Sequence, residues 1–514
     1  MLRQTLITRL PLLFRSWPRR ARTRRRLTCP AAAPHHLSTV RVLLLRPDPG
    51  NERFGLGPFF RVEPLGLEYV AAALISRGHE VTIADLRMRP GVEQLVRRAR
   101  PEVVGISALH SLEFDQALDL ARVVRRLAPG VPVMAGGHAA AAYSAALEQP
   151  SIVYVITEEG EEVAPALIDA LAHRRPPAEV PGLRYRGADG WTSSPPLTER
   201  IGLDGVPLPA RRLVDRYRNE YCCVQYRPVW AIETARGCPF RCSFCSVWQL
   251  FDRSFRERSI GAVVEDFHAS GPNVFVVDDL FWNHTARSLE LATQLKRSGV
   301  RKNWILVQSR CDLVSRHAEL LEAWRPLAEH FDIFFGFESP TQRGLDALQK
   351  DASPDETVKA VEVARACGYG ISGNFVVDPD WDLGRFRELW DFVQTHRLQR
   401  AGYTILTPLP GTALFDSLKP YIDGQPWFKY DMNHLLWEPR LGAKAFFDLY
   451  AETWRRSVLN VRGQTNWIKW LRQINPLHLP MLAQVLWRTQ RLVDAGAYLK
   501  ENDEKLTRLP AGAV

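Results

Sequence analysis

The chain has 514 residues, of which 46% are hydrophobic and 24% are charged, which is typical of a globular protein with two or three domains. No stretch approaches the roughly 18 uninterrupted apolar residues of a membrane-spanning helix, so none is expected. Eight cysteines are too few for a disulfide scaffold of this length, which favours a reducing, cytoplasmic location.

The formal charge of +10 is unevenly distributed. Residues 1–40 contain nine arginines and no acidic residue, and subtracting those charges leaves only +1 for the rest of the chain. The body of the protein is therefore nearly neutral, and no nucleic-acid partner is expected. We expect residues 1–39 to be a disordered basic leader or a mis-assigned extension. An organelle-type presequence and a basic arm for an anionic membrane remain alternatives.

Strands and helices alternate from residue 40 onwards. A continuous apolar run at Val40–Arg46 is typical of a buried parallel strand. Further strands are predicted at Glu80–Ala84, Val103–Ser107, Val131–Ala135 and Ile152–Ile156. With helical patterns between them, these strands predict a doubly wound, Rossmann-like α/β domain over residues 40–175, whose ligands bind at the carboxyl ends of the strands.

A second alternating series follows a proline- and arginine-rich linker at residues 176–225. Its strands are predicted at Val229–Thr234, Val274–Val277, Trp304–Gln308, Ile333–Gly336, Gly370–Val377 and Gly402–Leu406. Six strand–helix units predict a partial (β/α)6 barrel over residues 226–424, with its active site at the carboxyl ends of the strands. By strand position, Phe375 and Tyr403 are expected to point towards this mouth. Residues 425–514 are predicted to form a helical C-terminal region.

Three cysteines follow the first barrel strand with the spacing C-x3-C-x2-C: Cys238, Cys242 and Cys245. A structural zinc site would need a fourth ligand nearby, and the next histidine is His268. A disulfide is disfavoured, because the intervening loops are short and the chain shows no clear secretory signal. Three thiolates on one loop would bind three irons of a [4Fe–4S] cluster and leave the fourth iron open for chemistry.

This cysteine pattern resembles the signature of the radical S-adenosylmethionine (SAM) enzymes. By that resemblance, the open iron chelates SAM. One electron from an external donor then cleaves SAM to a 5′-deoxyadenosyl radical, which abstracts hydrogen from a substrate.

Motifs at later strand ends are similar to those of the same family. The resemblance implies that Asp278 and Asp279 accept hydrogen bonds from the SAM ammonium group and that Arg310 meets the SAM carboxylate. It also implies that Glu338, beside Ser339, contacts SAM. For the two aspartates, a helix N-cap is the structural alternative.

Small residues at strand ends of the first domain resemble the cobalamin-binding domain that precedes many radical SAM barrels. The implied cobalamin contacts are Pro64, Gly66, Ser107, Gly136, Gly137, Glu159 and Gly160. Small side chains would let the flat corrin ring approach the backbone closely. Many cobalamin domains carry D-x-H-x-x-G, whose histidine binds cobalt, but the corresponding stretch here is Asp85–Pro90 and has no histidine. A Rossmann nucleotide site is disfavoured, because no G-x-G-x-x-G follows the first strand.

Further segments at 46–60, 407–412 and 434–439 resemble hopanoid methylases. The resemblance spans residues 40–505 and implies a pentacyclic triterpenoid lipid substrate, methylated at C-3 on ring A. An unactivated C–H bond has no usable acidity, so a general base could not prepare it for polar methyl transfer. A radical that removes the hydrogen and methylcobalamin that supplies the methyl group would overcome this.

Apolar stripes with basic neighbours in the C-terminal region are typical of an interfacial membrane helix or of a helix packed on the barrel. The stripes comprise Trp467, Ile468, Trp470 and Leu471, then Met481, Leu482, Val485, Leu486 and Trp487. The first interpretation predicts peripheral contact with the inner membrane. Other functions remain open: methylation or cyclisation of a tetrapyrrole, peptide or small molecule, or a cobalamin sensor without catalysis.

Overall fold

The computed structural model describes residues 39–49, 59–88, 90–398, 400–458, 479–502 and 506–510. The predicted leader, apart from its last residue, lies outside this part of the chain. Among the described residues, no helix is both long and apolar enough to cross a bilayer.

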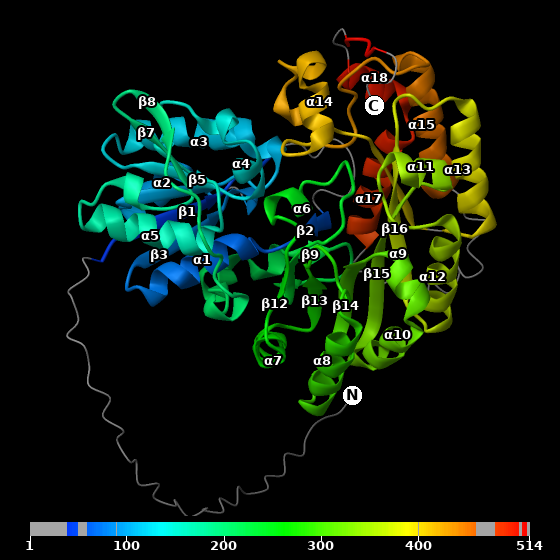
Figure 1. Cartoon of the computed structure of the whole chain (residues 1–514), viewed down its shortest axis with the longest axis horizontal. Helices are drawn as coiled ribbons and strands as arrows, with labels where there is room; N and C mark the ends of the chain where they lie inside the picture. Colours follow the sequence, from blue (N-terminus) through cyan, green and yellow to red (C-terminus); the bar gives the residue numbers. More distant parts are fainter. Residues whose placement is uncertain are drawn as a thin grey trace, which may run out of the picture. The chain divides into compact units, whose positions relative to one another are not determined.

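The first domain is built on a seven-stranded sheet with the order β3-β1-β4-β5-β6-β7-β8 (Figure 1). Its strands are β1 (Arg41–Arg46), β3 (Glu80–Asp85), β4 (Val103–Ser107), β5 (Val133–Gly136), β6 (Tyr154–Ile156), β7 (Leu183–Gly187) and β8 (Gly190–Ser193). The first five strands in this order, from β3 to β6 and including β1, are parallel, whereas β7 and β8 pair antiparallel at the edge. The sheet thus continues past residue 175, into the segment for which a linker is predicted.

Helices cover both faces of this sheet. They are α1 (Leu65–Ser76), α2 (Val92–Ala99), α3 (Phe114–Leu127), α4 (His138–Ala142) and α5 (Gly160–Ala172). One apolar cluster joins α1 and α5 to Val42 and Leu44, and another joins α2 and α3 to Leu43 and Leu45. Successive residues of β1 are therefore buried on opposite faces, which explains its continuous apolar run. The doubly wound α/β prediction is confirmed.

The second domain is an open parallel sheet with the order β10-β13-β14-β15-β16-β17. Its strands are β10 (Trp230–Ile232), β13 (Asn273–Val276), β14 (Lys302–Ser309), β15 (Ala328–Glu338), β16 (Gly370–Val377) and β17 (Ala401–Ile405). The main covering helices are α7 (Ile260–Ala269), α8 (Thr285–Arg297), α9 (Cys311–Arg316), α10 (Ala318–Trp324), α12 (Pro354–Ala366) and α13 (Leu383–Thr395). This arrangement confirms the partial (β/α)6 barrel.

Alternate residues of the barrel strands pack outwards against those helices. Ile305, Ile333, Phe375 and Tyr403 all belong to the large apolar core that also contains helix residues such as Phe386. The prediction that Phe375 and Tyr403 point towards the mouth is therefore wrong. The intervening residues, such as Asn374 and Thr404, face the concave side, because strand side chains alternate.

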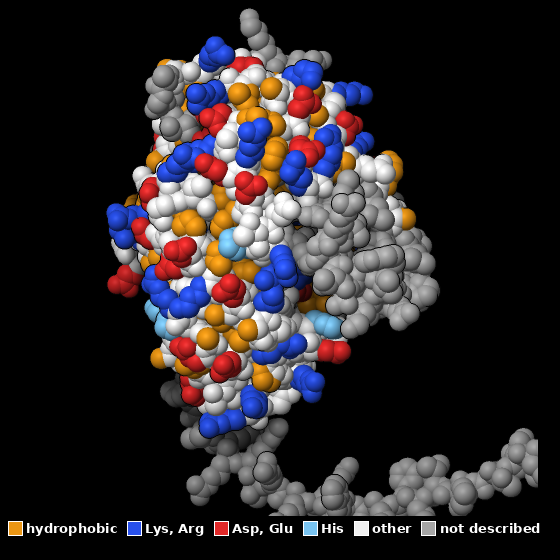
Figure 2. Space-filling view, turned by 90° about the vertical axis from the view of Figure 1, so that its right-hand side faces the viewer, with side chains coloured by type: hydrophobic (Ala, Val, Ile, Leu, Met, Phe, Trp, Pro, Cys, Tyr) orange, Lys and Arg blue, Asp and Glu red, His pale blue; other side chains and the backbone are white. Residues whose placement is uncertain are grey.

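The C-terminal region packs helices against the last barrel strand. It contains α15 (Ala443–Val458), α17 (Leu479–Leu492) and α18 (Ala495–Glu501), preceded by α14 (Ala413–Ile422). Residues 459–478, with Trp467, Ile468, Trp470 and Leu471 of the first stripe, lie outside the described residues. In the view of Figure 2, basic and acidic side chains are interspersed over the described surface.

Candidate functional site

The cysteine loop lies at the carboxyl end of β10. It is bounded by a short hairpin of β11 (Ala235–Gly237) and β12 (Phe255–Glu257) and leads into α6 (Val247–Leu250). Gly237 has φ +93°, and a Cβ there would collide with the carbonyl oxygen of Ser254. Only glycine meets both conditions, so the loop turns sharply just before Cys238.

The three cysteines of the loop are half-buried. Burial, followed by the neighbouring thiols Cys242 and Cys238, raises the pKa of Cys245 to about 12. Among the described residues, no three His, Cys, Asp or Glu side chains come close enough together to bind one metal ion. In a [4Fe–4S] cluster each thiolate binds a different iron, so three cysteines on one loop could hold three irons, which would keep the half-buried sulfurs as thiolates.

Arg310 supports this loop from the end of β14. Its guanidinium lies 3.6 Å from the ring centroid of Phe240, between the first two cysteines. Its Nε donates to Asp312 at 2.8 Å, which fixes the orientation of the side chain. The amide of Ser243 donates to the carbonyl of Leu348 at 3.0 Å, so the loop is also tied to the segment after β15.

Glu338 ends β15 at a register irregularity and has φ +58°. Lys350 donates to its Oε1 at 2.8 Å and to the carbonyl of Gly336 at 2.6 Å. A side chain at Gly336 would collide with both members of this ion pair. Ser339 follows as a buried residue whose hydroxyl bonds to the carbonyl of Thr341. No sequence motif predicts Lys350. Its positive charge lies near Cys242 and lowers the pKa of that thiol, which opposes the larger increase that burial causes.

The two aspartates after β13 have different environments. Asp278 is 1% exposed, and its carboxylate accepts hydrogen bonds from the amide and hydroxyl of Thr234. Burial raises its pKa to about 8. Asp279 is exposed to water. The Oδ2 atom of its carboxyl group accepts a hydrogen bond from the amide of Gly237 at 2.9 Å. Asp278 thus ties two strand ends together, while Asp279 supports the start of the cysteine loop.

In the first domain, small residues meet at the carboxyl edge of the sheet. Ser107 ends β4, and Gly136 is its partner at the end of β5. Gly137 has φ +117°, and a Cβ there would lie 2.8 Å from the carbonyl oxygen of Ala108. Pro64 and Gly66 begin α1, and no atom lies within 4 Å of a Cβ built on Gly66. Gly136 and Gly137 are thus required by close packing of the chain itself, whereas the space beside Gly66 is open; small residues at this carboxyl edge are compatible with a large flat cofactor such as cobalamin.

Glu159 and Gly160 have structural partners in the folded chain. Glu159 forms ion pairs with Arg256 and, at 3.2 Å, with Arg236, which also binds Glu233 and Glu161. A Cβ on Gly160 would lie 3.1 Å from Val70, so glycine lets α5 approach α1. These arginines lie in the barrel half, and sequence reasoning missed this link because its members are far apart in the chain.

A second contact joins the predicted cobalamin edge to the cysteine loop. Nε2 of His138, the residue after Gly137, lies 2.9 Å from the hydroxyl of Ser246, the residue after Cys245. Burial, with a smaller effect from His110, lowers the pKa of His138 to about 4, so its imidazole is neutral at physiological pH. The two predicted cofactor sites are thus adjacent in the folded chain.

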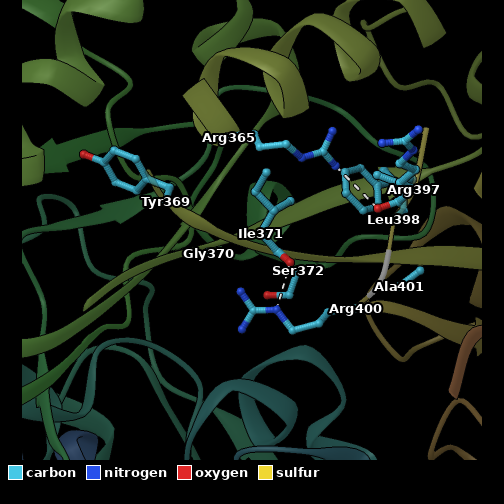
Figure 3. Close-up of a pocket in the computed structure, with 10 residues that line it drawn as sticks. Arg365, Tyr369, Gly370, Ile371, Ser372, Arg397, Leu398, Arg400 and Ala401 are labelled. Carbon is cyan, nitrogen blue, oxygen red and sulfur yellow. Dashed lines mark hydrogen bonds between the residues drawn. The ribbon is translucent and has the colours of Figure 1, made fainter. Parts of the chain in front are cut away.

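A separate cleft lies at the opposite ends of the barrel strands (Figure 3). Arg365, Arg397 and Arg400 line it beside the first residues of β16 and β17, and Arg400 donates to the carbonyl of Ile371 at 3.0 Å. Because active sites of this architecture form at the carboxyl ends of the strands, this cleft is distinct from the cysteine site.

Comparison with known proteins identifies both halves of the chain. Residues 58–168 match the family model of the B12 binding domain, and residues 232–393 match that of the Radical SAM superfamily. The chain is 30% identical to the hopanoid C-3 methylase of Methylococcus capsulatus over 82% of this chain and 85% of that protein. It is 24% identical to the anaerobic magnesium-protoporphyrin IX monomethyl ester cyclase of Rubrivivax gelatinosus, over 82% of this chain and 78% of that protein.

A solved structure shows the same fold. The cobalamin-dependent SAM radical enzyme OxsB superposes with a TM-score of 0.63 at 16% identity, covering 91% of this chain and 75% of that chain. The predicted cofactors, a [4Fe–4S] cluster, SAM and cobalamin, are therefore those of this protein. The chain belongs to the cobalamin-dependent radical SAM methylases.

Proposed function

We propose that this enzyme transfers a methyl group from methylcobalamin to an unactivated carbon of a hopanoid, at C-3 on ring A. The observation that carries the proposal is the 30% identity to a hopanoid C-3 methylase over most of both chains. The site supports it, because a cysteine loop fit for a cluster lies next to an edge fit for cobalamin. Methylation of an unactivated carbon needs both a centre that removes hydrogen from that carbon and a carrier that delivers the methyl group to it.

We assign the cluster to Cys238, Cys242 and Cys245. Asp279, at a strand end and open to water, is positioned to accept from the SAM ammonium, whereas Asp278 already accepts two hydrogen bonds from Thr234. Arg310 follows the end of β14, and its guanidinium is held against the cysteine loop, whereas Glu338 ends β15 and Ser339 follows it. When bound, the cluster and SAM supply a hydrogen-abstracting radical, and cobalamin supplies the methyl group.

The cobalamin contacts proposed are Pro64, Gly66, Ser107, Gly136 and Gly137. Glu159 and Gly160 act at this edge through the ion pairs and helix packing that hold α5 in place. Arg87, where other cobalamin domains have a histidine, is engaged by Asp85 through two hydrogen bonds of 2.9 and 2.6 Å. We infer that the protein supplies no nitrogen ligand to cobalt from this stretch.

Peripheral membrane contact also belongs to this proposal, since hopanoids are membrane lipids. Trp487 on α17 is 62% exposed, and the Arg491 guanidinium lies 6.0 Å from its ring centroid. An exposed tryptophan beside a cation is typical of a side chain at the lipid headgroup level. Liposome flotation should weaken on Trp487→Ser; flotation equal to that of the unaltered protein would contradict this contact.

The proposed activity is tested by expressing the gene in a hopanoid producer that lacks ring-A methylases. We expect hopanoids that carry one additional methyl group, located at C-3 by mass spectrometry and NMR. Cys242→Ser should abolish the product, whereas Cys367→Ser, a thiol outside the cysteine loop, should preserve it. A methyl group at another ring position would overturn the C-3 assignment. If the protein is expressed and loaded with its cofactors but the hopanoids remain unmodified, the assignment of a hopanoid as substrate is wrong.

A further inference from the structure

The concave face of the barrel sheet is closed at its amino end. Tyr226, just before β10, stacks on Trp304 of β14 with ring centroids 4.4 Å apart. The Trp304 indole in turn donates to Asp332 at 2.6 Å. From Trp304 to Ser309, β14 rises by roughly 16 Å at about 3.3 Å per residue. The distance from this floor to the cysteine loop therefore suits an elongated molecule.

Apolar side chains line one side of this face. Phe275 and Leu306 project from β13 and β14 into the cluster that contains Trp304. Phe334 of β15 faces the same side, because its neighbours Ile333 and Phe335 are buried in the outer core. Phe60, from the segment before α1, packs edge-on against Phe275 with centroids 5.7 Å apart. Phe334 and Phe60 remain 36% and 39% exposed, which is unusual for aromatic side chains on an inward face.

The opposite side of the face is small and electrically neutral. Asn374 of β16 donates to the hydroxyl of Thr404 on β17 at 2.7 Å, so these polar groups partner each other. Gly402 leaves room for the Asn374 side chain, since a Cβ there would lie 3.1 Å from its Oδ1. Two charged side chains on this face have partners: Asp332, which lies level with Leu306 in the sheet, pairs with Arg400, and Glu338 pairs with Lys350. A ligand against Phe334 and Asn374 therefore meets side chains that are uncharged or already paired.

We propose that Phe60, Phe275, Leu306 and Phe334 bind the ring system of a neutral, fused-ring substrate beneath the cysteine loop. Phe334 is the specificity-determining contact, since it is the most accessible of the phenylalanine, tyrosine and tryptophan side chains on the described barrel strands and lies four residues before Glu338. A wall whose charges are already paired disfavours a substrate with carboxylate or phosphate groups, because those charges would lose water without gaining a partner. The inference rests on the proposed function and names the residues that would recognise its substrate.

The test measures binding to the anaerobically reconstituted holoenzyme. The first probe is a tritiated hopanoid hydrocarbon delivered from cyclodextrin. The second is a matched pair of porphyrins, protoporphyrin dimethyl ester and its free acid. Phe334→Ala should weaken hydrocarbon binding by at least about tenfold, the usual effect of removing a buried aromatic contact. Phe334→Leu should restore most of the affinity. Leu127→Ala removes a similarly exposed side chain (39%) from α3 and should bind normally.

The outcomes separate the binding surface from the proposed function. Hydrocarbon binding that is equal in Phe334→Ala and the unaltered holoenzyme would overturn the surface while leaving the hopanoid assignment intact. If the unaltered holoenzyme does not bind the hydrocarbon but binds the neutral dimethyl ester, and Phe334→Ala weakens that binding, the surface is supported and the hopanoid assignment is overturned. Tighter binding of the dianionic free acid than of the ester would overturn the claim of a neutral substrate.

Discussion

At the residue scale, the site is held together by buried charges that have partners. Glu338 and Lys350 form such a pair at the end of β15, and Gly336 is small because both side chains occupy the space beside it. Arg310 is fixed in the same way by Asp312 and by the Phe240 ring. Cofactors that carry several charges need a protein frame whose own charges stay in place when they bind.

Replacing Lys350 tests this frame. Lys350→Met leaves the Glu338 carboxylate buried without its cation, which should lower the free energy of unfolding by roughly 3 kcal/mol. Urea denaturation should show this loss, and SAM cleavage should fall as well. The double variant Lys350→Met, Glu338→Gln removes both charges and should recover stability without recovering SAM cleavage. If Lys350→Met is as stable as the unaltered protein, the pair has no structural role.

Asp278 predicts a pH dependence of stability. Its folded pKa of about 8 lies above the usual value of 3.8, so the folded chain retains a proton that the unfolded chain releases. Stability from this group is therefore present at low pH and is lost as pH rises from about 4 to 8, by at most about 1.4 kcal/mol per unit. In the unaltered protein, urea denaturation should show the free energy of unfolding falling between pH 5 and 7. Asp278→Asn should make this fall smaller. Asp119→Asn, on the exposed face of α3, should retain the slope of the unaltered protein; an equal slope in both variants would contradict the assignment.

At the element scale, the strand ends deliver the chemistry and the sequence pattern reveals most of them. Apolar runs bounded by helical patterns locate all six barrel strands, and the cysteine spacing predicts the loop that would hold the cluster. The prediction for Phe375 and Tyr403 fails because alternation shows which residues share a face but not which face the helices cover; here the apolar faces of β16 and β17 pack against the helices. The edge strands β7 and β8 were missed, since their short segments are polar and lie between prolines.

Arg236 connects two elements that the sequence separates widely. It lies in β11 and pairs with Glu233 at 2.9 Å and with Glu159 and Glu161 at the start of α5. Arg236→Met would leave these acids buried without their shared cation, so we expect a loss of roughly 3 kcal/mol in urea denaturation. Faster proteolysis between β8 and β9 (Cys222–Cys223) and weaker cobalamin retention should accompany it.

A matched exposed arginine provides the control for this change. Arg97 pairs with Glu93 on the surface of α2, with side chains 76% and 57% exposed. Arg97→Met should cost less than about 0.5 kcal/mol, because solvent screens such pairs. Equal effects of the two substitutions would show that the Arg236 cluster does not join the domains.

At the scale of the whole molecule, the chain brings a methyl-carrier domain and a radical-generating barrel into contact. The motifs of each domain are recognisable separately, because their cofactors fix local residue types and spacings. Contacts such as His138 with Ser246 and the Arg236 cluster were not predictable, since they join residues separated by many positions without a shared pattern. Under the proposed function, those contacts would hold the cobalamin edge next to the cysteine loop.

The most direct test of the central claim is anaerobic turnover of the holoenzyme with a hopanoid deuterated at C-3. The account predicts deuterium in the 5′-deoxyadenosine released and one new methyl group on the same carbon, in matching amounts. Deuterium-free 5′-deoxyadenosine formed together with a methylated product would contradict it, because the methyl group would then reach the carbon without abstraction of hydrogen by the SAM-derived radical.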